Sequence, residues 1–475
     1  MEDCIGDMML KKAKPIEINP ENIFANDMLD RERIIINLTE IIKNAEEGFV
    51  LCVNAPWGNG KTTFINLWKA YLEKENFKTI YFNAWENDYS KEPLLSILNV
   101  LSTELKEKEE GAFNKVKQAG FKLLKAGLPI AVRAATMGII NFNELKDAMS
   151  DETDAAIAEL TAKAVENKMN ELAADKGIHE QFRAALTEYT KEAVDGNGQN
   201  KLIFFIDELD RCRPIYAVEL LEAVKHFFSV ENIVFVLSVD KKQLGDSIKT
   251  MYGMDMDTEG YLKRFFDISF SLPLPSRKRY IDYLYKVYEF KKFFENRQGY
   301  EGRQYEESHI VDTIKFLSDL WDLSLREVDH IFLTLSTAFI MTDKNKKLFP
   351  QFFAFLIILK QKEPDYYYRL SNDLSCINEV TALLENAAKN KKMDSHIVRL
   401  LDVFINVGCR NEEDCNVWLE ELKQNEDYIQ GDYWARGRVD IASGLMSHFD
   451  DGAIDSYRYI FNKIEFLENV DWSER

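Results

Sequence analysis

A run of small residues followed by a lysine and two hydroxyls carries the chemistry of phosphate binding. The segment 55–63 reads Ala-Pro-Trp-Gly-Asn-Gly-Lys-Thr-Thr. In such a loop, successive backbone N–H groups converge on the phosphates, the lysine reaches the β- and γ-oxygens, and the next hydroxyl binds Mg²⁺. Ala55 stands where glycine is usual, which the loop tolerates if small size rather than a positive φ is needed. We predict nucleotide contacts from Pro56, Trp57, Gly58, Asn59, Gly60, Lys61, Thr62 and Thr63.

Two adjacent carboxylates end a buried apolar run further along the chain. Asp207 and Glu208 directly follow Leu202–Ile206. An acid at the carboxyl end of a buried strand can hold hydrated Mg²⁺, and a second acid can orient and deprotonate the attacking water. We therefore assign the metal to Thr62 and Asp207 and the base role to Glu208. The alternative is that these acids only end a strand and cap the next helix.

Three further polar residues lie at or just after the ends of apolar runs. Ser238 and Asp240 share one face of their strand by the two-residue period, and either could sense the γ-phosphate or position water. The equally weighted alternative is a cap for the helix beginning at Lys241. For Asp210 a structural role is favoured, as a brace to Arg211.

Five short apolar runs are expected to form the strands that position these residues. Helical periodicity separates most of them, which predicts an α/β fold with a doubly wound parallel sheet and ligands at the carboxyl ends of the strands. The expected strands are 49–54, 79–82, 202–206, 233–239 and 268–272.

The rest of the chain is predicted to be helical. The core is therefore expected to be discontinuous, in 20–100 and 200–275, with an Ala- and Lys-rich helical insertion at 101–199. Helical segments are expected over 276–345 and 346–475. Residues 361–475 hold 23 acidic and 13 basic residues, so the last segment is acidic.

Composition limits the partners and the compartment. The chain has 475 residues and a net charge of −20, which disfavours nucleic acid as a partner. Six cysteines without a Cys-x-x-Cys pair and an N-terminus unlike a signal peptide predict a cytoplasmic protein. The stretch 112–133 is basic and amphipathic, so peripheral contact with the inner membrane face, docking on an acidic partner, or packing on the chain's own acidic tail are alternatives.

Taken together, these residues resemble the KAP family of P-loop NTPases, which is related to the AAA+ and STAND groups. The resemblance spans about residues 20–340 and implies the sheet order 5-1-4-3-2. It also implies that Arg31 helps form the base pocket, that 276–345 is a lid, and that Arg326 contacts the γ-phosphate. The alternative for Arg326 is a surface pair with Glu327 or Asp329. The motifs that carry it are Ala55–Thr62, Phe82–Trp85, Phe205–Arg211, Val236–Asp240 and Tyr261–Phe266.

Two departures from the family affect the expected activity. Many relatives carry Asp-Asp where this chain has Asp207 and Glu208, and a glutamate base suits hydrolysis better. Many relatives also carry transmembrane helices between the two motifs, and the insertion here is too polar for them. We expect a Mg²⁺-dependent ATPase whose nucleotide state drives a conformational or oligomeric switch, in bacterial anti-phage defence as the resemblance implies.

The alternative is an interaction scaffold that binds nucleotide with negligible hydrolysis. In either case the helical domains are expected to mediate homo-oligomerisation or recruit a partner protein. ATP is favoured over GTP because no Asn-Lys-x-Asp motif stands at a strand end. Arg264, expected on a helix over 259–266, is assigned as an arginine that acts on the site of a neighbouring subunit.

Overall fold

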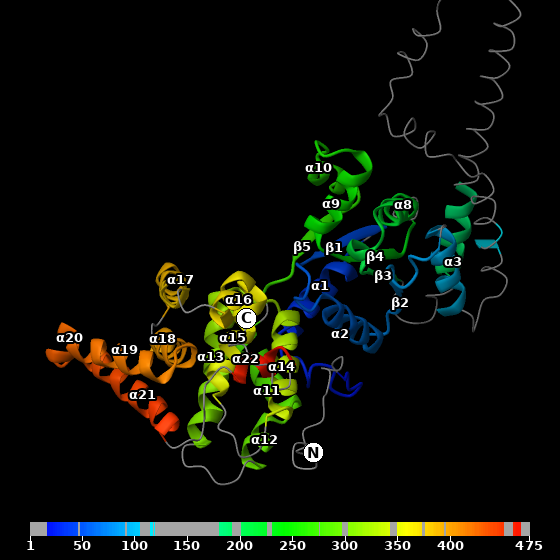
Figure 1. Ribbon diagram of the computed structural model, residues 1–475. Helices are drawn as coiled ribbons and strands as arrows, with labels where there is room; N and C mark the ends of the chain where they lie inside the picture. The colour runs from blue at the N-terminus through cyan, green and yellow to red at the C-terminus, as the bar shows by residue number, and fades with distance from the viewer. Residues whose placement is uncertain are drawn as a thin grey trace, which may run out of the picture. The chain divides into compact units, whose positions relative to one another are not determined.

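The structure is a computed structural model whose described residues fall into two compact units, one within Ile16–Leu274 and one within Pro275–Arg475 (Figure 1). Among these residues, no helix is both long and apolar enough to cross a membrane. The finer division predicted from the sequence, at 100, 199, 275 and 345, stays a prediction. The described residues are 17–45, 48–90, 93–104, 115–116, 118, 180–191, 201–225, 230–274, 276–296, 303–342, 349–372, 376–393, 396–450 and 459–466.

The first unit is built on a five-stranded parallel sheet. Its order is β2-β3-β4-β1-β5, which confirms the order implied by the family resemblance. The apolar runs predicted as strands all form strands, with ends shifted by at most one residue. The strands are β1 (Phe49–Asn54), β2 (Lys78–Asn83), β3 (Leu202–Asp207), β4 (Ile233–Val239) and β5 (Ile268–Ser271).

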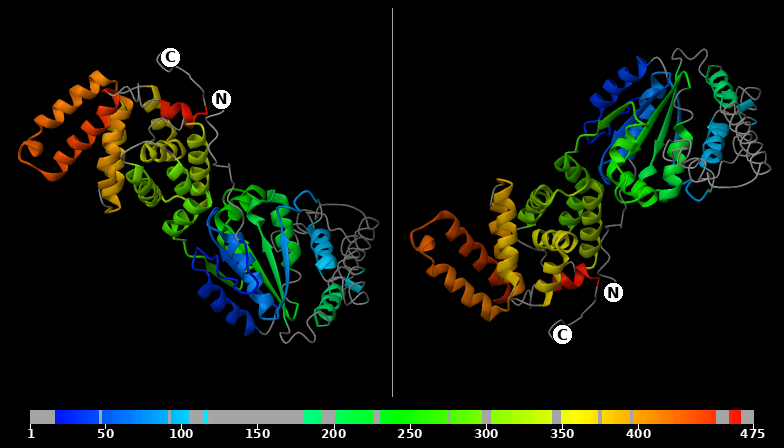
Figure 2. Two further views of the ribbon diagram at one scale, coloured as in Figure 1. Left: turned by 90° about the horizontal axis from the view of Figure 1, so that it is seen from below. Right: turned by 90° about the horizontal axis from the view of Figure 1, so that it is seen from above.

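Helices cover both faces of the sheet because alternate strand residues point to opposite sides (Figure 2). Val234 and Val236 pack with α1 (Glu32–Lys43) and α2 (Lys61–Lys74). Phe235 and Leu237 point to the other face. That face is covered by α3 (Pro93–Glu104), α8 (Pro214–Lys225), α9 (Lys241–Tyr252), α10 (Thr258–Leu262) and a helix at 180–191.

The strand register brings the polar strand ends to one edge of the sheet. Asn83 pairs with Asp207, and Asp207 pairs with Ser238. Asn54, the last residue before the phosphate loop, pairs with Val239. The residues singled out for chemistry therefore meet at this edge.

The basic stretch 112–133 lies mostly outside the described residues. Lys115 is described, and its ammonium pairs with the Glu188 carboxylate at 2.7 Å. This contact lies within the insertion itself. The proposed roles of the stretch at a membrane, a partner or the acidic tail stay predictions.

The second unit is helical, and its helices contribute to one hydrophobic cluster that extends in sequence from Ile281 to Ile464. Helix α15 lies within this cluster, and its residues from Pro350 to Leu359 are all buried. Residues 277–296 form two helices and not one, because Glu289 has a φ of 54° and breaks the helix. The helices are α11 (Arg277–Val287), α12 (Phe290–Asn296), α13 (Arg303–Leu320), α14 (Leu325–Ile340), α15 (Pro350–Lys362), α16 (Pro364–Asn372), α17 (Ile377–Asn390), α18 (His396–Cys409), α19 (Glu412–Gln424), α20 (Glu426–Ile429), α21 (Tyr433–Asp450) and α22 (Tyr459–Ile464).

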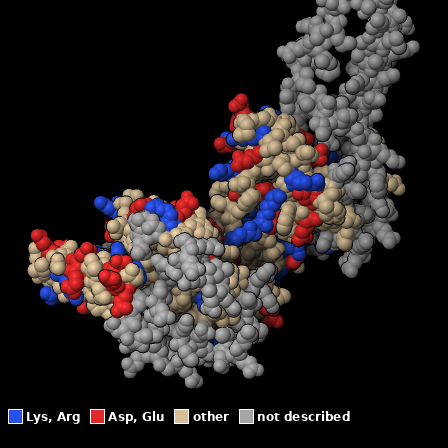
Figure 3. All heavy atoms as spheres, viewed as in Figure 1, with Lys and Arg blue, Asp and Glu red and all other residues tan. Residues whose placement is uncertain are grey.

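Acidic side chains are frequent on the last helices of this unit. Helix α19 has three acids in its first turn and α20 has two. Their negative charges interact favourably with the positive N-terminal ends of the helix dipoles. Figure 3 shows the acidic atoms gathered on this part of the unit. The acidic character predicted for the tail is thus carried largely by helix surfaces.

Gly408 of α18 lies in close contact with Phe352 of α15. A Cβ at position 408 would lie 2.6 Å from Cε1 and 2.9 Å from Cζ of this fully buried ring. We expect Gly408→Ala to lower the free energy of unfolding by about 1–3 kcal/mol, the usual effect of overpacking, although alanine is the better helix former. Urea unfolding of both proteins measures this difference.

Gly444→Ala in α21 is the matched control. An added Cβ there meets no described atom within 4 Å, so the better helix propensity of alanine should raise the free energy of unfolding by about 0.5–1 kcal/mol. Equal effects of the two substitutions would show that Phe352 moves aside without penalty.

Candidate functional site

The phosphate loop, residues 55–60, connects β1 to α2. Gly58 and Gly60 both have a φ of 78°, which glycine adopts without steric cost. Gly60 is the N-cap of α2 and offers no side chain to the first N–H groups of the helix, which suits an anion. Ala55 is 2% exposed and its φ is not positive. A small buried residue is therefore what the fold requires at this position.

Lys61 begins α2 and lies between a carbonyl and a carboxylate. Its Nζ donates to the Ala55 carbonyl oxygen at 2.7 Å and lies 3.5 Å from Asp210 Oδ2. The indole N–H of Trp57 donates to the same oxygen of Asp210 at 2.5 Å. The structure thus joins the phosphate loop to the segment after β3 through Asp210.

The predicted metal ligands lie together at the sheet edge. Asp207 is fully buried; its Oδ1 accepts the Glu208 N–H at 2.9 Å and its Oδ2 accepts the Tyr81 hydroxyl at 3.2 Å. Burial raises the pKa of Asp207, and the hydroxyls of Ser238 and Thr62 oppose this shift. One carboxylate and one hydroxyl, completed by phosphate and water, form a donor set that fits Mg²⁺.

Glu208 follows Asp207 in the left-handed conformation, with a φ of 62°. Its Oε1 pairs with Arg211 Nη1 at 2.7 Å, and its Oε2 accepts from Asn83 Nδ2 at 3.4 Å. Burial raises the pKa of Glu208, while Arg211 opposes the shift. The predicted brace between Arg211 and Asp210 is wrong, because the turn η1 (Leu209–Arg211) brings residues three apart together and points neighbours to different sides.

Ser238 and Asp240 are placed differently from one another. Ser238 is fully buried on β4 beside Asp207. Asp240 is the N-cap of α9, and its Oδ1 accepts the Lys242 and Gln243 N–H groups at 3.0 and 3.3 Å. Asp240 thus has the capping role that the sequence left as an alternative. That Ser238 or Asp240 positions water or senses the γ-phosphate stays a prediction.

Arg31 is 1% exposed and bonds to backbone carbonyls. It donates to Pro273 at 2.8 Å and to Asn59 of the phosphate loop at 3.5 Å. Burial lowers the pKa of this guanidinium, opposed by Asp27 and Asp30. The side chain supports the loop through Asn59, and its predicted part in a base pocket stays a prediction.

Arg264 is exposed, but not on a helix as predicted. Helix α10 ends at Leu262, and the Arg264 N–H bonds to the Tyr261 carbonyl at 3.1 Å in the turn that follows. The turn forms because Phe265 packs into the core. Arg264 is therefore an exposed cation that lies in a turn. The helix predicted over 259–266 is too long, because it ends at Leu262.

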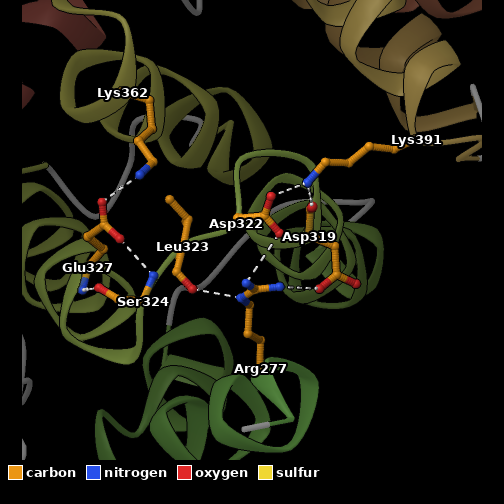
Figure 4. Close-up of polar contacts among 8 residues, drawn as sticks. All are labelled: Arg277, Asp319, Asp322, Leu323, Ser324, Glu327, Lys362 and Lys391. Carbon is orange, nitrogen blue, oxygen red and sulfur yellow. Dashed lines mark hydrogen bonds and ion pairs between the residues drawn. The ribbon is translucent and has the colours of Figure 1, made fainter. Parts of the chain in front are cut away.

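Arg326 is exposed in the first turn of α14, which belongs to the second unit. Polar contacts from α11 and from the C-cap of α17 hold the preceding turn (Figure 4). Arg277 of α11 donates to the Leu323 carbonyl at 2.7 Å, and Lys391 bonds to the Asp322 carboxylate at 2.5 Å. The predicted contact of Arg326 with a γ-phosphate stays a prediction.

A capping box fixes the start of α14 itself. Ser324 accepts the Glu327 N–H, and the Glu327 carboxylate accepts the Ser324 N–H at 2.7 Å. Lys362 of α15 pairs with the other oxygen of Glu327 at 2.6 Å. Arg326 is therefore presented from a helix start that is rigidly held within its own unit.

Sequence reasoning missed roles for Asn83 and for the pair of Trp57 and Asp210. Asn83 ends β2 as Asp207 ends β3, so the strand-end rule that found Asp207 could also have found Asn83. The contact between Trp57 and Asp210 joins residues 153 positions apart, and no local pattern signals it.

Comparison with known proteins finds a matching family and an uncharacterized relative. The model of the KAP family P-loop domain matches residues 31–338. An uncharacterized protein from Methanocaldococcus jannaschii is 27% identical over 195 residues, which cover 38% of this chain and 97% of that protein.

Two solved structures are also similar over most of their length. The ORC2 protein of Aeropyrum pernix, in ADPNP and ADP complexes, covers 92% of this chain and 98% of its own at 13% identity, with a TM-score of 0.32. Cdc6p from Pyrobaculum aerophilum covers 94% and 98% at 11% identity, with a TM-score of 0.34. These scores support no comparison of individual residues.

Proposed function

The chain belongs to the KAP family of P-loop NTPases, and from this premise we propose that it is a Mg²⁺-dependent ATPase whose nucleotide state drives a conformational or oligomeric switch. One observation supports the proposal that the chain hydrolyses ATP. Glu208 directly follows Asp207 at the sheet edge where Thr62 and Lys61 also lie. A protein that only held nucleotide would have no need of a second carboxylate placed there.

In the proposed reaction, a water oxygen bonds to the γ-phosphorus and the bond from that phosphorus to the β,γ-bridging oxygen breaks. Glu208 accepts the proton that the water loses. Lys61 neutralises charge on the β- and γ-oxygens, and Thr62 and Asp207 hold Mg²⁺, which supplies electrostatic stabilisation. Arg326 contacts the γ-phosphate and couples nucleotide state to the position of the lid.

A second candidate function is a nucleotide-dependent scaffold with negligible hydrolysis. The contacts of Glu208 favour it, because Arg211 and Asn83 engage one carboxylate oxygen each. A base held in this way must be released before it accepts a proton. The two functions differ in turnover and not in nucleotide binding.

The biological setting is proposed from the family resemblance. It is a cytoplasmic role in bacterial defence against phages, with the helical domains mediating self-association or recruiting a partner protein. The basic stretch 112–133 remains a candidate for contact with a membrane surface. Nucleic acid is not favoured, and stimulation of turnover by DNA would contradict that view.

Replacing Lys61 tests the proposed function. We expect Lys61→Ala to weaken Mg–ATP binding by about 10²-fold, the scale of losing one partner of a desolvated charge contact. We also expect Mg–ATP to change the elution volume of the wild type in size-exclusion chromatography, and not that of Lys61→Ala. Calorimetric titration measures the binding.

The matched control is Lys69→Ala on the same helix. Lys69 pairs with Glu73 at the surface at 2.7 Å, and such pairs contribute little, so binding and elution should match the wild type. Identical elution of the wild type with ATP, with ADP and without nucleotide would contradict an oligomeric switch.

A further inference from the structure

A buried carboxylate contacts the phosphate loop and has no part in the proposed hydrolysis. The Asp210 side chain is 1% exposed. Its Oδ2 accepts the Trp57 indole N–H at 2.5 Å and lies 3.5 Å from Lys61 Nζ. Its Oδ1 has no hydrogen-bond partner among the residues that the structure describes. The side chain therefore depends on Oδ2 for its polar contacts within the described chain.

This arrangement gives the phosphate-binding lysine a counter-ion inside the protein. The Lys61 side chain is 10% exposed, so the pair with Asp210 is largely shielded from water. Opposite charges attract more strongly when water is excluded. A buried charge that loses its partner is strongly unfavourable. A phosphate that draws Lys61 away therefore leaves Asp210 as an under-compensated anion.

We propose that Asp210 is a positioning residue that sets the nucleotide affinity of the loop by competing with the β- and γ-phosphates for Lys61. Trp57 assists because its N–H fixes the carboxylate oxygen that faces the lysine. Asp210 thus lowers affinity for nucleotide and keeps the loop ordered when no phosphate is bound. This inference rests on the proposed nucleotide binding at Lys61.

Asp210→Asn separates charge from shape. The amide oxygen still accepts the Trp57 N–H, while the negative charge beside Lys61 is removed. We expect the Kd of Mg–ATP, measured by calorimetric titration, to fall about tenfold, which corresponds to about 1.4 kcal/mol. A merely structural lesion would move the Kd in the opposite direction.

Asp267→Asn is the matched control for the loss of one negative charge. Asp267 accepts the Val50 N–H at 2.8 Å, at the amino end of β1 and so at the far edge of the sheet from the phosphate loop. Its Kd should equal that of the wild type. An unchanged or raised Kd in folded Asp210→Asn overturns the inference alone, whereas no binding of Mg–ATP by the wild type overturns the proposed function and this inference with it.

A second measurement needs no nucleotide and applies even if Asp210→Asn does not fold. Lys61→Met leaves Asp210 buried without its counter-ion, so we expect its Tm to fall by about 5 °C or more. Lys69→Met, the matched surface change, should leave Tm unchanged. An unchanged or raised Tm in Lys61→Met would show that Asp210 does not hold Lys61 and would overturn the inference.

Discussion

Glu208→Gln should keep Mg–ATP binding and slow hydrolysis by about 10²-fold or more, the scale of losing a general base. The amide has the shape of the carboxylate but accepts no proton from the attacking water. Lys61, Thr62 and Asp207 are untouched, so the Kd should change little. Release of phosphate under single-turnover conditions, alongside calorimetric binding, measures both quantities.

The pH dependence of turnover in the wild type tests the base role of Glu208 independently. The base must be ionised, and burial raises the pKa of Glu208 above its ordinary value of 4.5. Turnover should therefore be lost as the pH falls through that raised pKa, and not only near 4.5. Burial also raises the pKa of the metal ligand Asp207, so Mg–ATP binding measured over the same interval separates loss of the base from loss of the metal.

Glu86→Gln is the control for this substitution. Glu86 is an exposed glutamate in the loop after β2, close in sequence to the Asn83 that contacts Glu208. Its turnover should equal that of the wild type. If Glu208→Gln turns over at the wild-type rate, the general base is another residue. If the wild type itself shows no detectable hydrolysis, the scaffold function is favoured.

The parts of the site that the sequence predicted are those that depend on local pattern. A buried run followed by acids predicts a strand that delivers Asp207 to the sheet edge. The loop between a strand and a helix predicts that Lys61 and Thr62 begin that helix. Their meeting then follows from the rule that parallel strands present their carboxyl ends on one side.

The parts that it did not predict depend on tertiary contacts or on fine turn geometry. Arg31 reaches Pro273, 242 positions away, and no periodicity encodes that contact. Arg211 was expected to brace its neighbour Asp210, yet adjacent residues of a turn diverge and residues three apart converge. The structure therefore pairs Arg211 with Glu208 and leaves Asp210 to Lys61.

Arg211 and Arg264 both lie near the strand ends, and Arg211 pairs with Glu208 of its own chain, which leaves Arg264 as the arginine proposed to act on a neighbouring subunit. Tyr261, Leu262 and Phe265 are buried around Arg264, so the turn directs Arg264 outward. Arg264 makes no ion pair with any residue that the structure describes. An exposed arginine that has no ion-pair partner among the described residues is available to a site on a second copy of the chain.

Arg264→Ala should therefore lower the turnover number by about 10³-fold or more while leaving Mg–ATP binding intact. An arginine supplied by a neighbour stabilises the negative charge that builds on the transferring phosphoryl group, and such residues contribute about 10³–10⁵ to the rate. Lys263→Ala is the control, because Lys263 is an adjacent exposed cation that pairs with Glu259 at 3.1 Å. Its turnover should stay close to that of the wild type.

Mixing two inactive variants decides whether Arg264 acts between subunits. Glu208→Gln subunits keep Arg264, and Arg264→Ala subunits keep the base, so a mixed assembly contains complete sites in which one chain supplies Glu208 and the other supplies Arg264. Hydrolysis should therefore recover on mixing and rise with total protein concentration. If mixing restores nothing and the rate per subunit is independent of concentration, Arg264 does not act in trans and the chain hydrolyses ATP as a monomer.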